Sequence, residues 1–275
     1  MPPRRSLKQS IITHGVLLLV FQVVFLGAVF AFCRMAWGRF FLFLAITGAY
    51  HGLLTAFLYS RSDDFALEAT KERLARVNLS NSLTFGRLSS IPTLLFLIVQ
   101  ASSYSLVPVL LPFAVVVFAT DFLDGIIARK KHQVTFVGRY LDSTSDYAMI
   151  IAVSIIFLYY TLIPLWFFIL LISRLVLFAV GMAVLAVREG KADPVATFLG
   201  KASIFATMVL YVMELAELFR VPIIGSSIVV QIIEWIVACI IVASVVDKGI
   251  FLGRRFSQIP PRPRGPGRAR GASSS

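Results

Sequence analysis

Apolar residues fall into eight long runs along the chain, separated by shorter polar segments. Each run is close to the ~20 residues that an α-helix needs to cross the hydrocarbon core of a bilayer. The sequence therefore predicts an all-α integral membrane protein with about eight transmembrane helices. These helices are expected at residues 12–32, 39–59, 83–100, 106–128, 141–160, 163–187, 197–218 and 227–252.

The connections between the runs differ in charge. The nearly uncharged connections are residues 100–106, 159–165 and 219–227. The connections rich in Lys and Arg are residues 61–78, 129–139 and 188–201. Because cytoplasmic loops carry an excess of Lys and Arg, the basic connections and both termini are predicted to lie in the cytoplasm. Arg34 and Arg39 are the exceptions on the other side. The membrane would be the inner or plasma membrane of the cell.

Two segments do not fit the pattern of a membrane span. Residues 62–77 can begin a helix at Ser62, with Asp63 and Asp64 in its first turn, but its apolar face is incomplete. We expect a short interfacial helix there, with a solvated linker helix as the alternative. Residues 253–275 are rich in Pro, Gly, Ser and Arg, which predicts a disordered basic tail that can lie on anionic lipid.

Composition agrees with a membrane protein. Of the 275 residues, 58% are hydrophobic, which excludes an ordinary soluble domain of this size. The net charge of +12 comes from basic residues that flank apolar spans, so it indicates topology and contact with anionic lipid headgroups rather than nucleic-acid binding. Cys33 and Cys239 lie in or beside apolar runs and suggest neither a disulfide framework nor a metal site.

Four aspartates stand at the facing ends of two predicted helices. Asp121 and Asp124 are three residues apart, and Asp142 and Asp146 are four apart, so each pair shares one helical face. The short loop 129–140 makes the two helices antiparallel neighbours, and the four carboxylates can converge. Such a group needs compensating positive charge. Oxygen ligands alone favour Mg²⁺, Mn²⁺ or Ca²⁺ over zinc, and two ions sharing four carboxylates would suit phosphoryl transfer.

Other interpretations of the aspartates remain open at this point. They could be solvated helix ends that pair with the neighbouring basic residues Arg129, Lys130, Lys131 and Arg139. They could also line the path of a divalent-cation channel or transporter, although such channels usually place acidic rings around a symmetric pore. A catalytically inactive membrane scaffold is a third class.

The aspartates belong to a longer pattern, which reads Asp121-x2-Asp124-Gly125-x2-Ala128-Arg129 and, eight residues later, Gly138-x3-Asp142-x3-Asp146. This pattern resembles the signature of the CDP-alcohol phosphatidyltransferase family, and all eight defining positions match. The resemblance covers residues 78–252, which would form a core of six helices. Residues 1–61, with the first two helices, would be an addition to that core.

The resemblance implies an enzyme that transfers a phosphatidyl or substituted phosphoryl group from a CDP-linked donor to an alcohol, with release of CMP. It implies that Asp121, Asp124 and Asp142 bind Mg²⁺ or Mn²⁺. It also implies that Asp146 binds the second ion and accepts the proton of the acceptor hydroxyl. Membrane lipids are further partners, nucleic acid is not, and a homodimer is an open option.

The same resemblance implies a site for the CDP group. The residues that match its nucleotide-binding positions are Asn81, Thr84, Gly125, Arg129 and Thr135. Arg87 and Pro92 follow on the helix of Asn81 and are similar to the phosphatidylglycerophosphate synthase branch of the family. The alternative is that Asn81 and Thr84 only begin a helix and that Arg87 extends towards the membrane surface.

Two basic residues resemble an acceptor-phosphate site. Arg174 lies inside an apolar helix and should face the bundle interior, and Lys201 begins the next helix. Branches with a phosphorylated acceptor carry an Arg and a Gly-Lys in similar places, but they often continue Gly-Lys-x-Lys-Thr, whereas this chain reads Gly-Lys-Ala-Ser. Glu189 and Asp193 could instead simply pair with Lys201.

The resemblance favours CDP-diacylglycerol as the donor and glycerol 3-phosphate as the acceptor. The alternative within the family is a cholinephosphotransferase or ethanolaminephosphotransferase, in which CDP-choline or CDP-ethanolamine reacts with diacylglycerol. Inositol phosphate and serine are further acceptors to consider.

Overall fold

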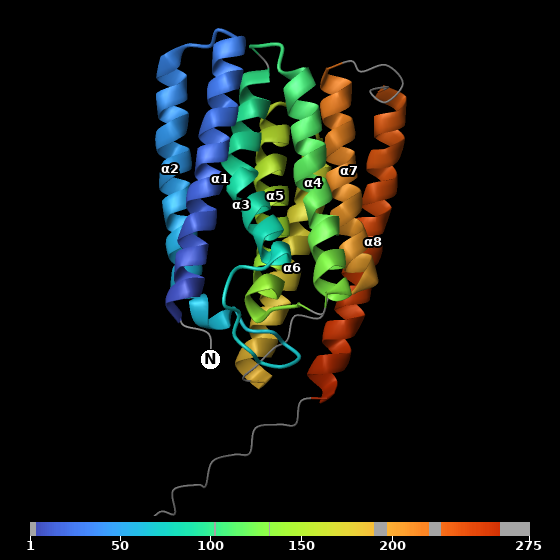
Figure 1. Cartoon of the computed structure of the whole chain (residues 1–275). Coiled ribbons are helices and arrows are strands. Elements are labelled where there is room, and N and C mark those ends of the chain that lie inside the picture. Colours follow the sequence, from blue (N-terminus) through green and yellow to red (C-terminus); the bar gives the residue numbers. More distant parts are fainter. Residues whose placement is uncertain (1–3, 102, 132, 190–196, 220–226, 259–275) are drawn as a thin grey trace, which may run out of the picture.

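In the computed structural model of the chain, the described residues form eight long α-helices that run up and down through one bundle (Figure 1). The structure describes residues 4–101, 103–131, 133–189, 197–219 and 227–258. All eight helices are long and apolar enough to cross a membrane, which confirms the predicted spans. Their bounds are α1 Arg4–Phe32, α2 Trp37–Ser60, α3 Leu79–Ala101, α4 Val107–Lys130, α5 Phe136–Tyr159, α6 Leu165–Glu189, α7 Phe198–Leu218 and α8 Ser227–Gln258.

The distribution of side chains is that of a protein dissolved in lipid. Large apolar side chains are exposed on the outside of the bundle, for example Leu53, Ile228 and Trp235. Polar side chains such as Gln22 and Thr93 are buried between helices. Since a bilayer offers no hydrogen bonds to the backbone, helices are the elements that such a chain can form there, and polar side chains find partners inside the bundle.

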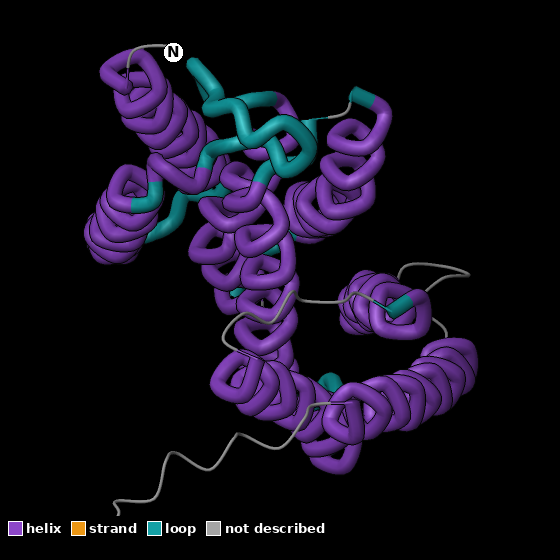
Figure 2. Tube along the Cα trace, turned by 90° about the horizontal axis from the view of Figure 1, so that it is seen from below, coloured by secondary structure: helices purple, strands orange, loops and turns teal. Residues whose placement is uncertain are grey.

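The first two helices attach to the remaining six through α3. Gln22 of α1 donates from Nε2 to Ser89 O at 2.8 Å, and its Oε1 accepts from Thr93 Oγ1. Tyr50 of α2 donates to Leu88 O at 2.9 Å. In Figure 2 the helix beside the N label, α1, lies at the edge of the bundle. The added helices are therefore fixed to the core by buried hydrogen bonds as well as by packing.

The prediction of an interfacial helix over residues 62–77 is wrong, because only the first turn of this segment is helical. The structure has one 3-10 turn at Ser62–Asp64, and then a turn flanked by two isolated β-bridges, Ala66 with Arg73 and Leu67 with Thr135. Phe136 N donates to Ala66 O at 3.1 Å, and Glu68 N donates to Val134 O at 3.0 Å. The chain gains these backbone partners from the connection between α4 and α5, which a sequence pattern cannot show.

We call residues 65–74 the clasp, because they cover the connection between α4 and α5. Phe65 anchors the clasp in the interior with 1% of its surface exposed. Glu68 forms an ion pair with Arg139 of α5. At the tip, Lys71 has a φ of 56°, which turns the chain back on itself. The clasp therefore fixes the start of α5, the helix that carries Asp142 and Asp146.

The basic tail begins later than predicted. We expected residues 253–275 to be disordered, but α8 continues to Gln258. Arg254 and Arg255 are good helix formers, and positive charge stabilises the C-terminal end of a helix. The guanidinium of Arg255 also lies 5.9 Å from the centre of the Phe251 ring. Residues 259–275 lie outside the described part of the chain.

Candidate active site

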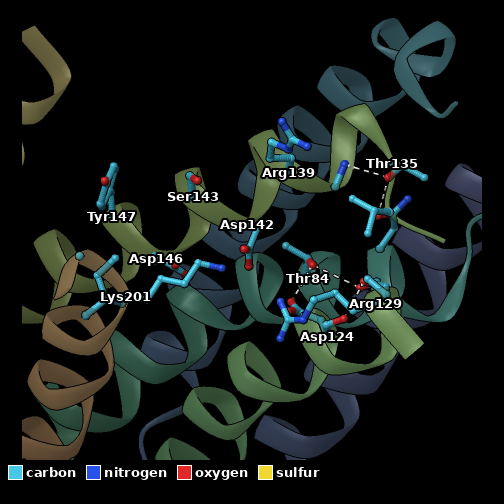
Figure 3. Close-up of a pocket in the computed structure, with 18 of the residues that line it drawn as sticks. Thr84, Asp124, Arg129, Thr135, Arg139, Asp142, Ser143, Asp146, Tyr147 and Lys201 are labelled. Carbon is cyan, nitrogen blue, oxygen red and sulfur yellow. Dashed lines mark hydrogen bonds between the residues drawn. The ribbon is translucent and has the colours of Figure 1, made fainter. Parts of the chain in front are cut away.

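A cavity of about 440 Å³ opens at the lower end of the bundle in Figure 1, where α3, α5 and α7 begin and α4 and α8 end. Figure 3 shows its walls at close range. Nearly all of the predicted site residues with described side chains lie here. The lining includes Asn81, Thr84, Asp124, Gly125, Arg129, Thr135, Asp142, Asp146 and Lys201.

Three of the four predicted carboxylates converge on one guanidinium. Nη2 of Arg87 lies 3.5 Å from Asp124 Oδ2, 3.0 Å from Asp142 Oδ1 and 3.2 Å from Asp146 Oδ1. Arg87 itself is 1% exposed. The side chain of Asp121 lies outside the described residues, although its backbone belongs to α4. The carboxylates of Asp124, Asp142 and Asp146 converge, as their spacing along the two helices predicts.

Hydroxyl groups hold this arrangement in place. Ser145 Oγ accepts from Arg87 Nε at 3.0 Å and donates to Asp142 O at 2.9 Å. The hydroxyl of Thr84, one helical turn before Arg87, lies 2.8 Å from Asp124 Oδ2. Ser80 Oγ donates to Asp124 O at 3.0 Å. Thus α3 and α5 each supply both a charged group and a hydroxyl that positions a neighbour, and α4 supplies Asp124.

The donor atoms fit a hard divalent cation, although Arg87 occupies the point that they share. Among the described side chains, no three His, Cys, Asp or Glu residues are close enough to form a ready-made metal site. The lining nevertheless offers carboxylate oxygens from two helices and, within the described residues, no His or Cys. Oxygen ligands of this kind suit Mg²⁺ or Mn²⁺. An ion would have to share the carboxylates with the guanidinium.

One wall of the cavity is formed by the starts of α3 and α5. Thr135 caps α5, accepts from Gly138 N at 3.0 Å and donates to Asn81 Oδ1 at 3.1 Å. A Cβ at Gly138 would lie 2.5 Å from Asn81 Oδ1, so only glycine allows this contact. The amide nitrogen of Asn81 is buried and has no hydrogen-bond partner among the described residues. It is available to a ligand in the cavity.

The last turns of α4 form the adjoining wall. Arg129 is exposed, and its Nη1 lies 3.3 Å from the position that a Cβ on Gly125 would take. Its guanidinium can therefore move without disturbing the packing of the helices. A flexible positive charge at the mouth of a cavity suits an anionic ligand such as a diphosphate.

The opposite wall is basic. In Figure 3, Lys201 lies on the side of Asp146, away from Arg129. Lys248 of α8 also lines the cavity, is only 7% exposed, and holds its Nζ 3.3 Å from the centre of the Phe178 ring. A Cβ on Gly200 would lie 2.8 Å from Lys248 Cε, so a larger residue at this position would push the end of the lysine side chain away from its present place.

Arg174 stands behind this wall and does not line the cavity. It is 2% exposed, and its Nη2 donates to Gly200 O at 2.9 Å. Its Nε donates to Ser244 Oγ of α8 at 3.3 Å. The sequence paired Arg174 with Lys201, but the structure places Lys248 beside the cavity instead. Asp193 and the side chain of Glu189, the alternative partners of Lys201, lie outside the described residues.

Comparison with known proteins decides the family. Residues 77–247 match the model of the family described as CDP-alcohol phosphatidyltransferase. The chain belongs to this family. The match begins just before α3, so α1 and α2 lie outside it.

Relatives in this family carry two kinds of name. The CMP-forming cardiolipin synthase of Streptomyces coelicolor is 30% identical over 150 residues, which are 52% of this chain and 67% of the relative. A putative cardiolipin synthase of Mycobacterium tuberculosis is 32% identical over 133 residues, 48% of this chain and 62% of the relative. The CDP-diacylglycerol–glycerol-3-phosphate 3-phosphatidyltransferase of Bacillus subtilis is 31% identical over 108 residues, 35% and 56% of the two chains.

The position of the helix ends suits the substrates of a CDP-alcohol phosphatidyltransferase. The first turns of α3, α5 and α7 all contribute to the lining, through Asn81, Gly138 and Gly200. The N-terminal end of a helix carries a partial positive charge and exposed N–H groups. Three such ends around one cavity favour an anionic ligand, in agreement with a diphosphate donor.

Sequence reasoning missed two residues of this site. The sequence links Arg87 to a branch of the family but does not identify it as the partner of the aspartates. Its signal was its position three residues after Thr84, on the same face of α3. Lys248 lies near the end of the last predicted span, and the sequence does not assign it to the site. Nothing in the sequence linked it to Gly200, because the contact joins α7 and α8 and depends on how these two helices pack.

Replacing Arg87 with Met should destabilise the protein most when divalent cations are absent. The change leaves Asp124, Asp142 and Asp146 without their shared counter-charge, at an expected cost of about 3–5 kcal/mol. The unfolding temperature in detergent should therefore fall sharply in EDTA, and Mg²⁺ should recover part of the loss.

The matched control is Arg139→Met, which removes an exposed ion pair and should change stability by less than about 1 kcal/mol. An equal loss in both variants, unaffected by Mg²⁺, would contradict the role given to Arg87.

Proposed function

We propose that this chain transfers a phosphatidyl group from CDP-diacylglycerol to the hydroxyl of glycerol 3-phosphate and releases CMP. The observation that carries the proposal is the arrangement of one cavity. Carboxylates and the predicted nucleotide contacts occupy one part, and the basic pair Lys201 and Lys248 occupies another. Asp146 lies between them. A donor and a phosphorylated acceptor can thus be held on either side of one carboxylate.

The nucleotide end of the donor would lie against the starts of α3 and α5. Asn81 has an unused amide donor there for the cytidine or its ribose. Arg129 would bind the diphosphate, since its guanidinium reaches over Gly125 at the mouth of the cavity. Thr84 and Thr135 would act mainly by positioning, because their hydroxyl groups contact Asp124 and Asn81.

We propose that Asp121, Asp124, Asp142 and Asp146 hold two divalent cations, Mg²⁺ or Mn²⁺. When bound, such ions neutralise the diphosphate and stabilise the leaving phosphate. Arg87 would share the charge balance of the carboxylates and keep them together while substrates exchange. Family members are in general dependent on divalent cations, which supports this part of the proposal.

Asp146 would accept the proton of the acceptor hydroxyl. As the hydroxyl oxygen forms its bond to the phosphorus next to diacylglycerol, the bond from this phosphorus to the CMP oxygen breaks. CMP leaves with the electron pair of that bond. Asp146 is 8% exposed and faces the cavity, so it can reach a substrate while bulk water is largely excluded.

The acceptor has two candidates with the same chemical core. Glycerol 3-phosphate is favoured by the two lysines in the wall, since a phosphate monoester carries up to two negative charges. Arg174 would position this wall through its hydrogen bonds to Gly200 O and Ser244 Oγ. Phosphatidylglycerol is the second candidate, because two of the relatives above are named as cardiolipin synthases. Transfer of a phosphatidyl group to its free glycerol hydroxyl would give cardiolipin.

We infer the orientation in the membrane from charge. The end of the bundle that carries the cavity also carries the basic residues Arg129, Lys130 and Lys131 at the end of α4, and Arg254 and Arg255 of α8. We propose that this end faces the cytoplasm of the inner or plasma membrane, where soluble CMP would be released.

Purified protein should release CMP from CDP-diacylglycerol when glycerol 3-phosphate is supplied, and EDTA should abolish this reaction. Phosphatidylglycerol is tested as the other acceptor, and labelled CDP-choline with diacylglycerol tests the alternative donor. Label that enters lipid only from CDP-choline would overturn the proposed donor. Full activity in EDTA would overturn the metal site.

Asp146→Asn should lower turnover about 10²-fold or more, because an amide cannot accept the hydroxyl proton. The measurement is the kcat for CMP release at saturating substrates and Mg²⁺. Asp64→Asn, in the exposed turn before the clasp, is the matched control and should keep normal turnover. A well-folded Asp146→Asn protein with near-normal kcat would remove this residue from the reaction.

Lys248→Gln should raise the KM of a phosphorylated acceptor about tenfold while the donor KM changes little. A hydrogen bond to a charged group contributes about 1.5–3 kcal/mol, and about 1.4 kcal/mol corresponds to tenfold in affinity. Lys130→Gln, at the exposed end of α4, serves as the control. Equal effects on both KM values would show that Lys248 does not distinguish the acceptor.

A further inference from the structure

The clasp, residues 65–74, meets the candidate active site through one ion pair. Glu68 is half-buried in the clasp, and its Oε2 pairs with Nη2 of Arg139 on α5. Arg139 also belongs to the lining of the active-site cavity, whereas Glu68 does not. One guanidinium therefore stands between a carboxylate outside the cavity and the ligand that the cavity would hold.

The position of Arg139 on α5 suits contact with a diphosphate. It lies four residues after Thr135, in the nucleotide wall, and three residues before Asp142, so these residues share one face of the helix. In Figure 3, Arg139 lies between Thr135 and Ser143. Arg129 lines the same cavity from α4. The two arginines would thus approach the phosphates of a donor from different helices.

The ion pair with Glu68 is too exposed to hold Arg139 against a stronger anion. The side chain of Arg139 is 42% exposed, and pairs at such exposure contribute little because water screens them. A diphosphate carries more negative charge than one carboxylate, and a guanidinium can bind phosphate oxygens through two parallel hydrogen bonds. A diphosphate in the cavity can therefore take Arg139 from Glu68.

The clasp does not need this ion pair to stay in place. Glu68 N donates to Val134 O at 3.0 Å, and Phe136 N donates to Ala66 O at 3.1 Å. Phe65 anchors the clasp in the interior. These contacts use the backbone and one aromatic ring, so the carboxylate of Glu68 can lose its partner while the clasp keeps its position.

The clasp also lies outside the part of the chain that matches the family, which begins at residue 77. The segment that follows the clasp is attached to α1. Ser6 Oγ donates to Ala75 O at 2.8 Å, and Ser10 Oγ accepts from Val77 N at 3.2 Å. The added N-terminal part of the chain thus reaches the active site through Glu68.

We propose that Arg139 is a further donor-binding residue and that Glu68 of the clasp competes with the donor for it. Without donor, Arg139 pairs with Glu68. When the donor binds, the guanidinium changes partner and binds the diphosphate, and the carboxylate of Glu68 is left to water. The inference rests on the proposed function for the CDP-linked donor. Glu68 therefore lowers the affinity of the site for its nucleotide, which eases the exchange of one nucleotide for the next.

The test measures the binding of CDP to purified protein by titration calorimetry in the presence of Mg²⁺. Glu68→Gln keeps the size and the backbone contacts of this residue but removes the competing charge, so CDP should bind about two- to fivefold more tightly. Arg139→Gln removes the cation and should weaken CDP binding about tenfold. Arg139→Lys keeps the charge and should recover part of this loss.

The double variant shows whether the two residues act together. If Glu68 acts by holding Arg139, then Glu68→Gln should have no effect on CDP binding in Arg139→Gln protein. Glu72→Gln is the matched control. It removes the same charge from an exposed position of the clasp that does not line the cavity, so the affinity for CDP should stay at the wild-type value.

The outcomes separate competition from a structural contact. Unchanged or weaker CDP binding in Glu68→Gln would overturn the proposal, because the ion pair would then only support the fold. A gain that persists when Arg139→Gln is also present would overturn it too. Wild-type affinity in Arg139→Gln would remove Arg139 from the donor site. Failure of the wild-type protein to bind CDP would instead overturn the proposed function.

Discussion

The guanidinium of Arg87 is the interaction on which this structure depends. Three carboxylates within a membrane bundle repel one another, and none of them is fully solvated by water. One buried arginine lies within 3.5 Å of all three and joins α3 to α4 and α5. Removing a partner from such a group is costly because the remaining charges stay buried. The group that prepares the site for cations is therefore also the group that holds these helices together.

The central role of Arg87 makes α3 the organising helix of the protein. One face presents Asn81 and Thr84 to the active-site cavity, and another presents Leu83 and Gly86 to a second, mainly apolar cavity beside α1. Further along, Ser89 and Leu88 accept the hydrogen bonds that attach α1 and α2. The candidate active site and the two added helices thus share α3, and a change in the position of α3 would affect both.

The features that the sequence predicted are those set by local rules. Apolar runs of spanning length predicted eight helices, and the three- and four-residue spacings placed Asp124, Asp142 and Asp146 on facing helices. The failures involve contacts between distant segments. The clasp takes its backbone partners from the start of α5, which no periodicity reveals. Lys248 replaces Arg174 at the cavity because the packing of α6, α7 and α8 decides which cation faces inwards.

The two walls of the cavity use the same local device. Thr135 and Thr197 each cap a helix and accept from the N–H of a glycine three residues later, Gly138 and Gly200. In both places a side chain from another helix occupies the space that a Cβ would need: Asn81 at the first glycine and Lys248 at the second. Each cap thereby points a positive helix end at the cavity and brings a polar group to it. Gly138 is part of the family signature, and Gly200 makes the equivalent contact on α7. This contact gives a physical reason for the Gly-Lys pair there. Gly200 leaves room for the side chain of Lys248, and Lys201 adds the second positive charge of the basic wall.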